Sequence, residues 1–85
     1  MNINKLEILE NICYTELVYE RINKKLNLSF SKKQIEKFIA QVLKETEDVF
    51  FLKNGKNFYV TNKENNIKIT INSTTFRVIT VNKIA

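Results

Sequence analysis

Apolar residues in the first half of the chain recur at helical spacing. The clearest stripe follows Ser31, which can act as an N-cap with Gln34 closing a capping box, and it consists of Ile35, Phe38, Ile39, Val42 and Leu43. A second stripe begins after Thr15 and consists of Leu17, Val18, Ile22 and Leu26. Asn4 is a plausible N-cap for a shorter helix. We therefore predict three helices, over residues 4–12, 15–27 and 31–45.

The second half of the chain changes from helical to alternating periodicity. Apolar and polar residues alternate from Ile67 to Asn72, which is typical of a half-buried strand. Asn54-Gly55 lies between the apolar segments 49–53 and 56–61 and favours a type I′ hairpin, in which both central residues have positive φ. A fourth strand is predicted over residues 75–81. These strands predict an antiparallel meander.

The register of this sheet can be predicted by placing apolar residues on one face. A two-residue turn at Asn54-Gly55 would set Phe51 opposite Phe58 and Val49 opposite Val60. The following turns would set Val60 opposite Ile67 and Ile69 opposite Phe76. The apolar face would then hold two layers, Val49/Val60/Ile67/Val78 and Phe51/Phe58/Ile69/Phe76. The predicted fold is α+β, with a three-helix layer (about 4–45) packed on one face of a four-stranded sheet (about 49–82).

The same register predicts an unusual composition for the opposite face of the sheet. Two aromatic and two cationic residues would share one row across the four strands, namely Phe50, Tyr59, Lys68 and Arg77. The next row would hold Leu52, Asn57, Thr70 and Thr75, with Ile79 beyond it. Aromatic and Arg side chains are enriched in protein interfaces, and they also bind nucleic acid. The predicted binding residues are Phe50, Asn57, Tyr59, Lys68, Thr75 and Arg77.

The distribution of charged residues along the chain also points to the predicted sheet as the binding surface. Residues 1–48 carry eight basic and eight acidic side chains, whereas residues 49–85 carry six basic side chains against Glu64 alone. The net charge of +5 therefore belongs to the predicted sheet half. Lys, Asn and Ile make up 35 of the 85 residues, and their AT-rich codons favour a low-GC bacterium, phage or plasmid as the source.

Length and residue types bound the possible functions. At 85 residues we expect one domain over 1–85 and no deep catalytic cleft. The chain has no His, and Cys13 is its only Cys, so neither a general base for nucleophilic catalysis nor a metal site is evident. No cofactor is predicted. The absence of a signal-peptide pattern and of a long apolar run predicts a cytoplasmic protein without membrane association.

Several binding functions stay open. The main expectation is a non-enzymatic binding protein that uses the open sheet face for a protein partner or a second copy. The alternative is an anionic ligand on that face, either single-stranded nucleic acid or a signalling nucleotide. A lesser alternative is a winged-helix DNA-binding protein whose recognition helix would offer Lys33, Lys37, Gln41 and Lys44. Acidic residues in the segment 31–48 oppose this last hypothesis.

Three segments carry a family resemblance. They are Tyr14-Thr15-Glu16-Leu17 with Glu20-Arg21-Ile22, then residues 55–60, and then residues 76–80. Over residues 14–83 the chain resembles a small bacterial and phage family that is catalogued as domain of unknown function 3781. The resemblance implies the domain extent and a bacterial or mobile-element setting, but no reaction, cofactor or site. That setting motivates a further hypothesis, an inhibitor of a host defence system that acts by binding.

Overall fold

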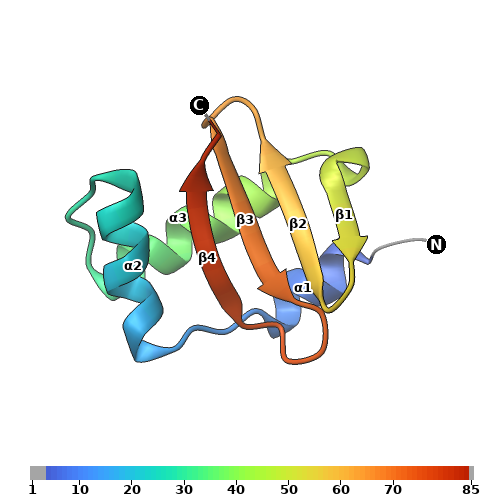
Figure 1. Ribbon diagram of the computed structural model, residues 1–85, viewed down its shortest axis with the longest axis horizontal. Coiled ribbons are helices and arrows are strands. Elements are labelled where there is room, and N and C mark those ends of the chain that lie inside the picture. The colour runs from blue at the N-terminus through green and yellow to red at the C-terminus, as the bar shows by residue number, and fades with distance from the viewer. Residues whose placement is uncertain (1–3, 85) are drawn as a thin grey trace.

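The computed structural model describes residues 4–84 and contains the predicted helices and sheet. The elements are α1 (Lys5–Asn11), α2 (Glu16–Leu26), α3 (Lys32–Glu45), a 3-10 turn η1 (Asp48–Phe50), β1 (Phe51–Asn54), β2 (Asn57–Asn62), β3 (Ile67–Asn72) and β4 (Val78–Lys83). The strands form an antiparallel sheet in sequence order (Figure 1). The α+β fold class is confirmed, with the helices first and the sheet second.

The helices begin where the sequence predicts. The Asn4 side chain accepts a hydrogen bond from the Glu7 amide, and Ser31 and Gln34 form a reciprocal capping box. Thr15 is the N-cap residue of α2, but its side chain makes no capping hydrogen bond. At the other end of α2, Asn27 adopts the left-handed conformation (φ 57°), which Asn tolerates better than most residues.

One face of the sheet forms the core with the helices. Its central row runs across all four strands and consists of Phe51, Val60, Ile69 and Val81, each buried. α3 lies behind β3 and β4, and α2 runs alongside β4 (Figure 1). The helices contribute the buried side chains of Ile8, Val18, Ile22, Leu26, Ile35, Ile39, Val42 and Leu43. Because the helices pack on this face only, the opposite face of the sheet is left open.

The register of the first hairpin differs from the predicted one. Phe51 pairs with Val60, not Phe58, because the two residues between the strands are Gly55 and Lys56 rather than Asn54 and Gly55. Gly55 has φ 63°, and Lys56 is not among the residues with positive φ, so the turn lacks the two positive φ angles of type I′. Val60 then pairs with Ile69 instead of Ile67. Both shifts are by two residues and leave the buried face unchanged.

The last strand pair departs further from the prediction. Ile69 pairs with Val81 rather than Phe76, and β4 begins at Val78 rather than at residue 75. Thr70 pairs with Thr80 whereas Ile71 pairs with Val78, so Ile79 is the extra residue of a β-bulge. The bulge allows Val78 and Val81, three residues apart, both to point into the core.

Two residues assigned to the core from sequence are exposed. Val49 lies in η1 rather than in a strand and is 79% exposed. The chain makes this 3-10 turn between α3 and the sheet, so β1 starts only at Phe51. Leu17 is 71% exposed because α2 packs against β4 through Val18 and Ile22. The predicted layers therefore lose Val49 and gain Val81.

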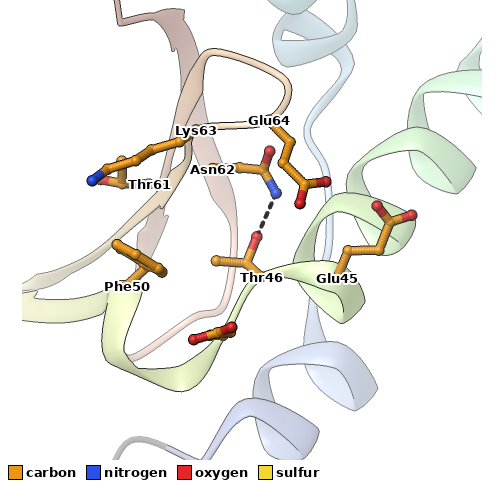
Figure 2. A pocket seen from close by; sticks show the side chains of 8 residues that line it. Glu45, Thr46, Phe50, Thr61, Asn62, Lys63 and Glu64 are labelled. Carbon is orange, nitrogen blue, oxygen red and sulfur yellow. Dashed lines mark hydrogen bonds between the residues drawn. The ribbon is translucent and has the colours of Figure 1, made fainter.

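A buried polar contact joins the end of α3 to the end of β2. The Asn62 side-chain amide donates to the Thr46 hydroxyl at 2.8 Å, and that hydroxyl donates to the Val42 carbonyl at 2.6 Å (Figure 2). The Asn62 carbonyl oxygen accepts from the Asn65 backbone amide at 2.8 Å. The Lys5 ammonium donates to the Thr46 carbonyl at 2.6 Å, which also ties α1 to this junction. Thr46 and Asn62 therefore fix the helix layer to the sheet.

We predict that Asn62→Ala lowers the free energy of unfolding by about 1–3 kcal/mol, because it leaves buried partners without their hydrogen bonds. Urea unfolding monitored by circular dichroism measures this change. The matched control is Asn82→Ala, since Asn82 faces away from the core and its side chain makes no hydrogen bond with another residue between 4 and 84. Equal losses in the two variants would contradict the structural role of the Thr46 contact.

Candidate functional site

The candidate site is the open face of the sheet, on the side away from the helices. Side chains alternate along a strand, so the residues next to the core row point outward. The outward residues form three rows, namely Leu52/Tyr59/Thr70/Thr80, Thr61/Lys68/Asn82 and Asn54/Asn57/Asn72. The four strands contain no Asp or Glu. The open face is therefore rich in hydroxyl and amide groups, with a cation and no carboxylate.

Three of the predicted binding residues come together on this face. The Lys68 ammonium lies 5.8 Å from the centroid of the Tyr59 ring, within the range of a cation–π contact. The Asn57 side-chain amide donates to the Tyr59 hydroxyl at 3.3 Å. Lys68 on the neighbouring strand β3 therefore contacts the Tyr59 ring, and Asn57, two positions away on β2, holds the Tyr59 hydroxyl.

Phe50 does not lie in the predicted row with Tyr59. It belongs to η1, and the Lys63 ammonium lies 5.3 Å from its ring centroid. Phe50 lines a cavity of about 160 Å³ beside the Thr46–Asn62 contact, and Figure 2 shows Glu45 and Glu64 on the far side of it. The prediction failed because the chain makes a 3-10 turn at Phe50 before β1 begins.

Arg77 and Thr75 also lie outside the predicted rows. Arg77 precedes β4 and forms an isolated parallel bridge with Cys13, in the segment between α1 and α2. The Thr75 hydroxyl accepts from the Arg77 amide at 3.3 Å, and the Thr75 carbonyl accepts from the Cys13 thiol at 3.5 Å. Between them Phe76 has φ 60°, an uncommon conformation for a bulky residue. The late start of β4 therefore removes both residues from the sheet.

Three residues outside the predicted binding set also lie on the open face or beside it. Leu52 is 65% exposed on β1, and Ile79 is 37% exposed at the bulge of β4. The Arg21 guanidinium, from α2, donates to the Ile79 carbonyl at 3.3 Å. Sequence reasoning missed Arg21, because its approach to β4 depends on how α2 packs. Leu52 and Ile79 were assigned to this face correctly.

The centre of the open face is closed. Thr70 is buried although it lies on this side of the sheet, and the Thr80 hydroxyl is buried without a partner among the described residues. The exposed groups lie around this centre, with Leu52 at the β1 edge, Ile79 at the β4 edge and Lys68 on β3, whereas Tyr59 is half-buried. A flat surface with this distribution suits contact with another large molecule better than enclosure of a small one.

The chain that carries this surface matches the sequence model of a known protein family. A family described as "Protein of unknown function (DUF3781)" has a sequence model that matches residues 6–82. The chain belongs to this family. The resemblance noted over residues 14–83 is thereby confirmed, and the DUF3781 description assigns no reaction or ligand. Neither the curated proteins nor the solved structures yield a match.

Titratable side chains of this DUF3781 member also meet beside the helices, away from the open face. The Tyr14 and Tyr19 rings stack at 5.4 Å, and the Tyr19 hydroxyl donates to the Glu36 carboxylate at 2.6 Å. Burial, followed by the effect of the Glu36 charge, raises the pKa of Tyr14 well above its usual range. Burial and the Glu36 hydrogen bond raise the pKa of Tyr19 to about 12. Both phenols are therefore protonated at neutral pH.

The described side chains include no group of three or more His, Cys, Asp or Glu residues placed to hold a metal ion. Among the helices described for this DUF3781 member, none has the length and apolar content needed to cross a membrane.

We predict that Tyr14→Phe leaves the free energy of unfolding unchanged or raises it by up to about 1 kcal/mol, because the buried Tyr14 hydroxyl has no partner among the described residues. The matched variant Tyr19→Phe removes the hydrogen bond to Glu36 and should lower it by about 0.5–1.5 kcal/mol. Thermal unfolding by calorimetry compares them. A Tyr14→Phe loss as large as that of Tyr19→Phe would show that the Tyr14 hydroxyl is satisfied.

Proposed function

We propose that this protein is a non-enzymatic binding protein whose open sheet face docks on an acidic surface of a different protein. The observation that carries the proposal is the composition of that face. Exposed Leu52 and Ile79 share it with Tyr59 and Lys68, Arg21 of α2 lies beside it at β4, and the four strands contain no carboxylate. Apolar, aromatic and Arg side chains together are the combination that protein interfaces concentrate.

The exposed apolar residues favour a protein over a nucleic acid. Leu52 and Ile79 would gain free energy from burial against apolar groups, which phosphates do not offer. Base stacking needs an accessible aromatic face, whereas Lys68 already lies over the Tyr59 ring. Phe50, the second aromatic residue of that hypothesis, lies in η1 with Lys63 over its ring. The two rings therefore do not form a continuous stacking platform.

The charge of the open face favours a partner other than a second copy. In a twofold symmetric dimer, the same patch meets itself, so each Lys68 would approach the partner's cationic surface. No carboxylate from the four strands is available to compensate this repulsion. We therefore expect a monomer in solution and a partner whose contact surface carries Asp and Glu.

An anionic ligand is the second candidate, and the net charge is the observation that favours it. The sheet half of the chain carries the entire net charge of +5, and Lys68 with Asn57 and Thr61 could contact phosphates. The winged-helix hypothesis has weaker support. α3 lies against the sheet through Ile35, Ile39, Val42 and Leu43, and Tyr19 engages the α3 residue Glu36.

The residue types support binding without catalysis. The chain has no His, the Cys13 thiol is exposed with only a long contact to the Thr75 carbonyl, and the raised tyrosine pKa values disfavour those phenols as bases. A free thiol fits a reducing compartment, and we propose a cytoplasmic location on that ground. Inhibition of a host defence protein by occupancy is one role that such a surface could serve.

Affinity capture with wild-type protein and single variants tests this proposal. We predict that Tyr59→Ala and Lys68→Glu each reduce recovery of a specific partner from source-cell lysate by about tenfold or more, because both alter the aromatic and cationic groups of the open face. Mass spectrometry of the retained proteins measures the recovery. Circular dichroism should show unchanged folding in both variants.

The matched control is Lys37→Glu, which makes the same charge change on an exposed residue of α3. It should retain the partner as wild type does. Equal recovery by all four proteins would refute the open face as the docking surface. Recovery that disappears after nuclease treatment, with oligothymidylate binding lost in Lys68→Glu, would favour the second candidate instead. A concentration-dependent dimer that Tyr59→Ala dissociates would overturn the inference of a different partner.

A further inference from the structure

A second hollow, of about 340 Å³, lies where the loop between α2 and α3 meets the turn between β2 and β3. We name it the end groove. It is lined by Leu26, Leu28, Phe30, Phe38, Asn65, Asn66, Ile67 and Lys83. Within residues 4–84 the lining consists of five apolar residues, two amides and one cation, without a carboxylate. This volume lies in the range of small-molecule sites.

The floor of the end groove is apolar and held in shape by hydrogen bonds. Phe30 and Phe38 pack edge to face, with centroids 6.0 Å apart, above the buried side chains of Leu26 and Ile67. The Asn23 side chain holds the loop by bonding both the Phe30 carbonyl (2.9 Å) and the Phe30 amide (3.1 Å). Because this bidentate contact fixes the loop, the groove is formed before any ligand arrives, which lowers the entropic cost of binding.

Lys83 provides a single positive charge at the rim. It pairs with Ile67 across β3 and β4, so it extends from the same face of the sheet as the buried Ile67. Within residues 4–84 its ammonium has no ion pair or hydrogen bond. The carbonyl of Asn66 accepts from the Ile84 amide at 2.9 Å, which holds the end of β4 beside the turn. An unpaired ammonium therefore stands next to an apolar floor.

We propose that the end groove is a binding site for a small organic anion with an apolar body, such as an aryl or branched alkyl carboxylate. The apolar body would lie on Phe30, Phe38 and Leu28, and the carboxylate would reach the Lys83 ammonium. Charge complementarity selects an anion, because Lys83 is the only charged residue among the lining residues that the structure describes. Lys83 and Lys68 project from opposite faces of the sheet, so this site does not depend on the proposed function.

Titration with phenylbutyrate, followed by two-dimensional ¹H–¹⁵N NMR of the whole chain, tests this site. We expect saturable shifts confined to amides around Leu28, Ile67 and Lys83, with an affinity in the roughly millimolar range for a ligand of this size. Phenylbutanol, which lacks the charge, should bind more weakly. Lys83→Met should weaken phenylbutyrate binding about three- to fivefold and leave phenylbutanol binding unchanged, because the contact is solvent-exposed.

Two further variants serve as a charge control and as a variant that fills the groove. Lys68→Met, which removes a cation from the open face, should bind phenylbutyrate as wild type does. Leu28→Trp, which fills the groove, should abolish binding of both probes, with retained amide dispersion showing that the chain folds. Absence of saturable shifts at the groove would overturn the proposal. So would equal affinities for acid and alcohol that Lys83→Met leaves unchanged, or shifts at the groove that depend on protein concentration alone and indicate a second copy.

Discussion

Helices cover only one face of the four-stranded sheet, and the burial of that face determines most of the remaining structure. The row Phe51, Val60, Ile69 and Val81 packs under α2 and α3 and fixes the register of every strand pair. A regular β4 could not bury both Val78 and Val81, so the strand bulges at Ile79. The Thr46–Asn62 contact then holds the helix layer over this row. No helix packs on the other face, and there the sequence places hydroxyls, amides and Lys68.

Local signals in the sequence predicted the helices well because the groups that determine a helix end lie within a few residues. Ser31 and Gln34 form their capping box within one turn, and Asn4 caps α1. The buried face of the first three strands was also predictable, since a register shift of two residues leaves each side chain on its original face. Tyr59, Asn57 and Lys68 were therefore assigned to the same face correctly, although Lys68 pairs with Thr61 and lies one row away from Tyr59 rather than in its row. Phe50, Thr75 and Arg77 were not, because a 3-10 turn before β1 and the late start of β4 arise from tertiary packing that no short segment encodes.

The two candidate surfaces differ in the physical basis of recognition. The open face has exposed groups spread around a buried Thr70 and includes the Lys68 cation, so it favours a large partner with complementary charge. The end groove is concave and apolar with one ammonium at its rim, so it favours a small anion. The first half of the chain is electrostatically neutral, which leaves the sheet half as the source of long-range attraction. Membership of the DUF3781 family is compatible with both, since its description assigns no ligand.

Photo-crosslinking from position 52 tests the docking surface most directly. A photoreactive phenylalanine analogue at Leu52, an exposed residue at one edge of the open face, would react with any protein seated there. We expect a covalent adduct with a different protein from position 52 and none from position 37 on α3. Adducts that form from position 37 and not from position 52, or that contain only a second copy of this chain, would contradict docking of a different protein on the open face.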